Sequence, residues 1–112
     1  MELSLKEKIA FLHALKCMMI ADGEVAPREM ELINKFASMR GVEVGRHEFD
    51  QALSMSDNEA KIILSAMSED KRRLLGFLLQ DMARADGKID SGERIYWMKI
   101  KNEINITNIN DL

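Results

Sequence analysis

The chain has 112 residues and a net charge of −3. The length is typical of one domain, and the charge gives no electrostatic footprint for nucleic acid. A single cysteine excludes an internal disulfide, and no signal-peptide pattern or bilayer-length apolar run is present, so we expect a cytoplasmic protein without membrane insertion. Abundant Leu, Met, Ala, Lys and Glu favour helices over strands.

The first half of the sequence predicts two helices joined by a short loop. The first begins at a capping box, Ser4-Leu5-Lys6-Glu7, and ends at Asp22-Gly23. Helical spacing predicts its buried stripe as Leu5, Ile9, Leu12, Leu15, Met18 and Met19. Pro27 occupies a first helical position, and Gly41 ends the second helix. That helix is expected to bury Met30, Ile33, Phe36 and Ala37.

Two short helices are expected next, and we interpret them as a connector. Residues 46–54 form the first, with Phe49, Ala52 and Leu53 facing inward. Ser56-Asp57-Asn58-Glu59 is a second capping box, and it opens a helix through Ile62, Ile63 and Met67.

The last part of the chain predicts another pair of helices. Ser68 caps the first, which ends at Asp86-Gly87. Asp90 and Glu93 form a capping box for the second, which carries Ile95, Trp97, Met98 and Ile100. We therefore predict an all-α fold of about six helices in one domain, residues 1–104, followed by a tail, residues 105–112.

One nine-residue motif occurs twice, at 21–29 and 85–93. Both copies read Ala-Asp-Gly, one variable residue, a β-branched residue, three variable residues and Glu, and they lie 64 residues apart. Ser4 and Ser68, which cap the first helix of each pair, are also 64 residues apart. A period of this size in so short a chain indicates a duplication. We expect two helix–loop–helix units, about 4–40 and 68–104, related by a pseudo-two-fold axis.

The repeated loops carry candidate metal ligands. The motif resembles the second half of an EF-hand calcium loop, but the positions four and two residues before each Asp hold Met18, Ile20, Met82 and Arg84, so neither copy is a complete EF-hand. If the two loops meet, their carboxylates could together bind a divalent cation such as Ca, Mg or Mn. The candidate ligands are Asp22, Glu24, Glu29, Asp86, Asp90 and Glu93.

A structural interpretation of the same acidic residues stays open. Glu93 is accounted for by its capping box with Asp90, and Glu29 suits the positive first turn of a helix. Asp22 and Asp86 fit less well, because negative charge is unfavourable at a helix C-terminus, although either could form an Asx turn.

The duplicated motif at matching helical positions resembles the tellurite-resistance TerB-like family. Similar domains occur at the N-terminus of some membrane-anchored J-domain co-chaperones. The resemblance covers about Leu5 to Glu103, and it implies an all-helical fold, an acidic metal-binding cluster and a stress-response role. The motif positions carry over to Asp22, Gly23, Glu29, Asp86, Gly87 and Glu93. Lys88, opposite Glu24, departs from this acidic pattern.

Three other features have ordinary explanations. His13 and Cys17 lie one turn apart and could both face a metal, but nothing in the sequence completes a zinc site, so we interpret them as a boundary histidine beside a small apolar cysteine. His47 is expected to face water. The run Lys71-Arg72-Arg73 is interpreted as a solvated helix face.

Two hypotheses about function follow. No nucleophile or phosphate-binding motif appears, so we do not expect an enzyme. The leading hypothesis is a small TerB-like binding module with a metal-linked or stress-linked role. The alternative is a protein-interaction scaffold, or co-chaperone-like adaptor, without metal; in either case an unknown protein partner is expected.

Overall fold

Helices form all the regular secondary structure in the computed structural model, which describes residues 2–19, 27–85 and 89–112. This confirms the predicted all-α fold. The helices in chain order are α1 (Leu5–Met19), α2 (Pro27–Met39), α3 (Arg46–Ser54), α4 (Asp57–Ser65), α5 (Glu69–Arg84) and α6 (Ser91–Glu103). No helix in these ranges is long and apolar enough to cross a membrane.

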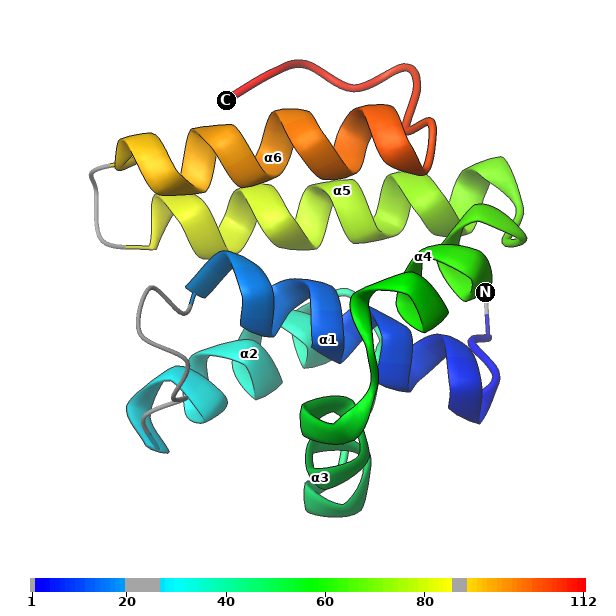
Figure 1. The fold of residues 1–112 in the computed structure, drawn as a ribbon. Coiled ribbons are helices and arrows are strands. Elements are labelled where there is room, and N and C mark those ends of the chain that lie inside the picture. Colours follow the sequence, from blue (N-terminus) through cyan, green and yellow to red (C-terminus); the bar gives the residue numbers. More distant parts are fainter. Residues whose placement is uncertain (1, 20–26, 86–88) are drawn as a thin grey trace.

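Helix α1 lies at the centre of the fold and contacts all five other helices. In Figure 1, α5 and α6 run antiparallel on one side of α1, with α2 and α3 on the other and α4 beside the α1 N-terminal half. The segment from Ile9 to Leu15 is buried along its whole length, which suits a helix covered on every side. Helices α3 and α4, expected only to connect the two halves, are part of the packing around α1.

The structure confirms the predicted helix caps at Ser4 and Asp90 and the predicted end of α2 at Gly41. The backbone N–H of Ser4 donates to Glu7 Oε1 at 2.7 Å, and the N–H of Glu7 donates to Ser4 Oγ at 3.2 Å. Asp90 and Glu93 form the same reciprocal pair. Gly41, with φ of +80°, follows the end of α2 as predicted, because glycine adopts left-handed backbone without steric cost.

Several apolar residues of the predicted helices are exposed, including Leu5 and Leu53, which were predicted to be buried. The short helices each have one covered face, the one against α1: α3 buries Phe49 and Ala52, and α4 buries Ala60 and Leu64. Their neighbours project into solvent, as do three residues at other helix surfaces; the exposed set is Leu5, Leu53, Ile62, Ile95 and Met98. The apolar stripes were therefore predicted too wide.

The segment after α6 contains no helix but packs against the domain. Ile104 and Ile106 are buried, and in Figure 1 the segment turns back after α6 and runs along that helix on the side away from α1. A Cβ atom on Gly76 of α5 would lie 3.2 Å from Ile106 Cγ2 and 2.8 Å from Ile109 Cδ1. The glycine thus permits close approach of this segment to α5.

The basic run at the start of α5 is bound to the chain ends, so its interpretation as a solvated face is wrong. Lys71 donates to Glu7 of α1 at 2.9 Å. Arg72 donates to the carbonyl of Ile104 at 3.1 Å, and Arg73 to that of Thr107 at 3.3 Å. The role of these three side chains is decided by contacts with residues far away in the sequence, which the local sequence pattern cannot show.

Candidate functional site

The structure describes only half of the predicted acidic loop site. Glu29 lies partly buried in the first turn of α2. Asp90 and Glu93 form the capping box of α6, with the Glu93 N–H donating to Asp90 Oδ1 at 2.7 Å. Their capping role is confirmed, and a cation site in the loops stays a prediction. The other three predicted ligands lie outside the described residues: Asp22, Glu24 and Asp86.

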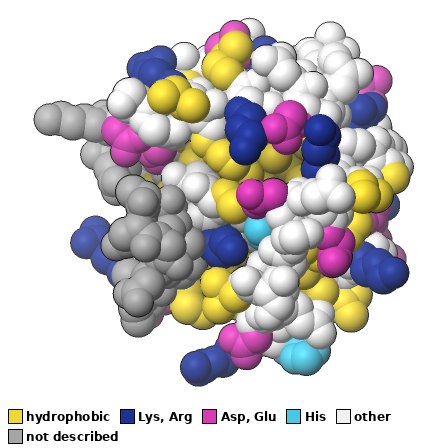
Figure 2. Space-filling model, in the orientation of Figure 1, with side chains coloured by type: hydrophobic (Ala, Val, Ile, Leu, Met, Phe, Trp, Pro, Cys, Tyr) yellow, Lys and Arg dark blue, Asp and Glu magenta, His cyan; other side chains and the backbone are white. Residues whose placement is uncertain are grey.

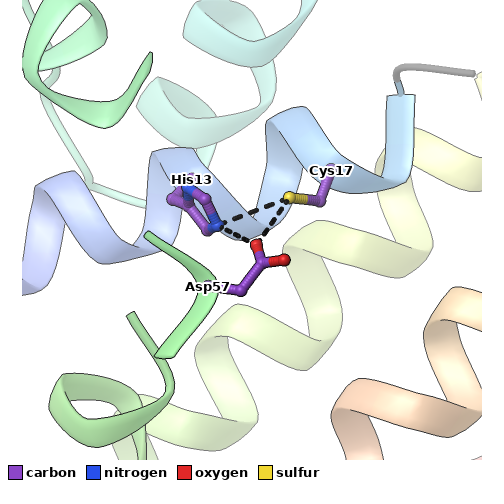
Figure 3. Close-up of side chains that lie close together, drawn as sticks. All are labelled: His13, Cys17 and Asp57. Carbon is purple, nitrogen blue, oxygen red and sulfur yellow. Dashed lines mark hydrogen bonds and ion pairs between the residues drawn. The ribbon is translucent and has the colours of Figure 1, made fainter. Parts of the chain in front are cut away.

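A different cluster of ligand-type side chains lies between α1 and α4. His13 and Cys17, one turn apart on α1, both face Asp57, the first residue of α4 (Figure 3). His13 is only 5% exposed, Cys17 is partly buried and the Asp57 side chain is 80% exposed. The cluster therefore extends from the edge of the core to the surface.

The three functional atoms converge on one another. His13 Nε2 lies 2.6 Å from Asp57 Oδ1 and 3.5 Å from Cys17 Sγ, and Sγ lies 3.7 Å from Oδ1. Tetrahedral zinc would separate nitrogen from sulfur, and sulfur from oxygen, by about 3.6 Å, and nitrogen from oxygen by about 3.3 Å. The two distances that involve sulfur already fit, while Asp57 needs a small outward rotation.

The other imidazole nitrogen is held by the backbone. His13 Nδ1 lies 3.3 Å from the carbonyl oxygen of Ala52, which can only accept a hydrogen bond. In the neutral ring this places the proton on Nδ1 and leaves the Nε2 lone pair directed at Cys17 and Asp57. A carbonyl behind a histidine ligand is the usual outer partner in metal sites, where it fixes the tautomer and ring orientation.

The arrangement differs from that of a nucleophilic triad. A triad histidine uses one nitrogen for the nucleophile and the other for the acid. Here Cys17 and Asp57 both face Nε2, and the backbone holds Nδ1. Both groups therefore lie within reach of the same ring nitrogen, and neither is placed as the orienting acid of a triad.

Charge is balanced within the cluster in the metal-free protein. The Cys17 sulfur and the Asp57 carboxylate raise the pKa of His13 to about 9, although burial opposes the charged form. Hydrogen bonding to His13 in turn lowers the pKa of Asp57. At neutral pH, His13 is therefore an imidazolium paired with Asp57, and any metal ion bound to Nε2 would have to displace its proton.

The cluster forms one wall of an open pocket of about 210 Å³ between α1, α4 and α6. Ala60, Leu64 and Ile100 provide apolar lining, and Tyr96 lies beside Cys17 and Asp57. Burial and these two neighbours raise the pKa of Tyr96, which keeps its phenol protonated. Figure 2 shows this face, with apolar side chains between acidic and basic ones.

The structure corrects the sequence interpretation of His13 and Cys17 in two respects. Their spacing was recognised as suited to two ligands, but the third group, Asp57, was missed and the histidine is buried. Asp57 was counted only as part of a capping box, and it lies 44 residues from His13. The Ser56 cap itself is present, since Ser56 Oγ accepts from the Glu59 N–H. His47 is exposed, as predicted.

Comparisons with known proteins establish the fold alone. No family model and no curated protein sequence matches the chain. Among solved structures, the chain is similar to the crystal structure of a protein of unknown function from Porphyromonas gingivalis W83, with a TM-score of 0.74 and 23% identity. The match covers 98% of this chain and 85% of the other.

Proposed function

We propose that this protein is a small helical metal-binding module whose site consists of His13, Cys17 and Asp57. The observation that carries the proposal is the convergence of three ligand atoms, all within 4.8 Å of one another, on the wall of an open pocket. The carbonyl of Ala52 supports it by holding the far side of the imidazole ring.

The donor set favours zinc over hard cations. Thiolate and imidazole are ligands of Zn²⁺, whereas Ca²⁺ and Mg²⁺ prefer oxygen alone. This differs from the Ca, Mg or Mn expected at the acidic loops, so the two candidate sites call for different ions. A metal-linked or stress-linked role of the TerB-like kind is our proposal for the physiological context, and it rests on the repeated motif.

Titration with Co²⁺ tests the proposed site directly. Cobalt replaces zinc in such sites, and its bond to a thiolate gives a near-ultraviolet charge-transfer band. We expect one equivalent of Co²⁺ to produce this band and one equivalent of Zn²⁺ to abolish it. His13→Ala, Cys17→Ser and Asp57→Asn should each weaken zinc binding at least tenfold.

Matched controls come from the same chain. His47→Ala removes an exposed histidine of α3, and Asp50→Asn removes an exposed carboxylate; both variants should bind zinc like the parent. Zinc should also slow alkylation of Cys17 by iodoacetamide. Absence of the cobalt band together with unchanged alkylation would overturn the proposal.

A groove on another face favours the alternative, a protein-interaction scaffold. It has a volume of about 430 Å³ and lies between the first half of α1, α3 and α4. Ile62, 63% exposed, lies at this groove together with Met55 and Ile63. We expect a photo-crosslinking residue at position 62 to capture a partner protein in cells, while one at exposed Ile95 of α6 serves as the control. Equal labelling from both positions would count against this scaffold role.

A further inference from the structure

The pocket beside the metal cluster has the composition of a ligand site. The three protein ligands leave one position of tetrahedral zinc open, as in zinc sites that bind substrate or water. Because His13, Cys17 and Asp57 themselves line the pocket, a fourth ligand can come from a molecule inside it.

The volume and the lining of the pocket favour a small ligand with an apolar part. Its volume of about 210 Å³ is below the roughly 300–1,000 Å³ typical of sites for drug-sized ligands. Ala14, Ala60, Leu64 and Ile100 supply hydrocarbon surface from three helices. A compact ligand with a short apolar body therefore fits better than a sugar or a nucleotide.

The charges around the pocket favour an anion. Zinc with one thiolate and one carboxylate is neutral, so the rim determines the sign. Lys61 and Lys99 lie on the rim with one acid, Glu103, which is 4.0 Å from Lys99. The metal-loaded pocket thus has one excess positive charge, which matches a monoanion.

From these observations we propose that the pocket binds a short-chain monocarboxylate, with its carboxylate on the open metal position and its apolar tail against Leu64 and Ile100. The inference rests on the proposed metal site. Carboxylate oxygen is an ordinary zinc ligand, and the lysines on the rim attract it without having to contact it. Binding would exchange a water on the open zinc position for a carboxylate oxygen, with no change in any covalent bond of the ligand or the protein.

Hexanoate is a suitable probe, with hexanol and hexylamine as a neutral and a cationic control. We expect hexanoate to bind the zinc-loaded protein at least tenfold tighter than the metal-free protein, by calorimetry. The two controls should bind at least tenfold more weakly. Amide signals of Tyr96 and Ile100 should shift, and hexanoate should alter the visible bands of the cobalt form.

Variants separate this inference from the metal site. Replacing Lys61 and Lys99 together by Met should weaken hexanoate binding at least threefold and leave zinc binding unchanged. Lys35→Met, at an exposed position of α2, should change neither. If zinc binds but hexanoate leaves the cobalt bands unaltered, the inference is wrong and the metal site stands. If zinc fails to bind, both are wrong.

Discussion

The ammonium of Lys71 lies 2.9 and 3.2 Å from the two carboxylate oxygens of Glu7. The two residues are 64 positions apart, the spacing of the duplicated motif. Each is the third residue of its helix, after Ser4 in α1 and after Ser68 in α5. Equivalent turns of the two units therefore meet. Superposition of residues 4–40 on 68–104 stays a prediction, and this contact is what a shared axis near the two helix starts would produce.

Lys71→Met should lower the free energy of unfolding by about 1–2 kcal/mol at pH 7, because both side chains are partly buried. Burial tends to raise the pKa of Glu7, but the backbone hydrogen bond from Ser4 and the Lys71 ammonium outweigh it and leave the pKa lowered. A carboxylate with a lowered pKa stabilises the fold above its unfolded pKa, and this is lost as pH falls through the folded pKa. Urea denaturation should therefore show the mutational effect at pH 7 and little of it at pH 3.

Metal-free protein should lose stability in alkali through His13. Its pKa is raised from 6.5 to about 9 in the folded state, so its contribution is complete below about pH 6.5 and disappears as pH rises through 9. We expect a loss on the order of 1–3 kcal/mol, limited by the solvent exposure of Asp57. Urea denaturation in chelator between pH 6 and 10 measures it. Cys17→Ser and Asp57→Asn should each reduce this dependence, because both side chains raise the pKa of His13, whereas His47→Ala should keep it.

Zinc binding should release protons near neutral pH. His13 is protonated below about pH 9, and a metal ion that binds Nε2 must displace that proton. Calorimetry in buffers of different ionisation enthalpy should therefore give at least one proton per zinc at pH 7. A count near zero in the parent would show that zinc does not bind at His13.

Gly76→Val should detach the C-terminal segment from α5, because a Cβ there already meets Ile106 and Ile109 within about 3.2 Å. Trp97 donates its indole N–H to Asp111 of that segment at 3.2 Å and is 1% exposed. We expect a red shift of Trp97 fluorescence and a loss of about 1–3 kcal/mol. Gly92→Ala is the control, since α6 exposes that residue, and it should leave the emission unchanged.

The acidic loops can be tested apart from the His13 site. If Asp22 and Asp86 bind a cation and follow their helices as the sequence predicts, replacing both by Asn removes unfavourable charge and should not lower the metal-free melting temperature. It should also abolish any stabilisation by Ca²⁺ while leaving the response to Zn²⁺ intact. A lower melting temperature in chelator, with no calcium response in the parent, would instead assign both residues to turn formation.

Local features of this fold were predictable, and long-range ones were not. The caps at Ser4, Ser68 and Asp90 follow from hydrogen bonds within one helical turn, which the sequence displays directly. The exposure of Leu53 and Ile62 depends on which face of each short helix meets α1. The helical spacing of apolar residues predicts which side of a helix is buried, but not how many residues beside that side the neighbouring helices also cover.

The candidate site shows the same division. His13 and Cys17 lie on one helix, so their shared face was visible in the sequence. Asp57 joins them only because α4 packs across α1, and its position in a capping box supplied a sufficient explanation without metal. No periodicity or spacing connects residues 13 and 57, and only the tertiary fold places them together.

The first turn of α5 holds both ends of the domain at once. Lys71 holds the start of α1, while Arg72 and Arg73 hold the carbonyls that follow α6. Although almost a hundred residues separate these ends along the chain, unwinding that one turn would release them together. Amide hydrogens at the beginning of α1 and around Ile106 should therefore exchange at matching rates, as one cooperative opening unit.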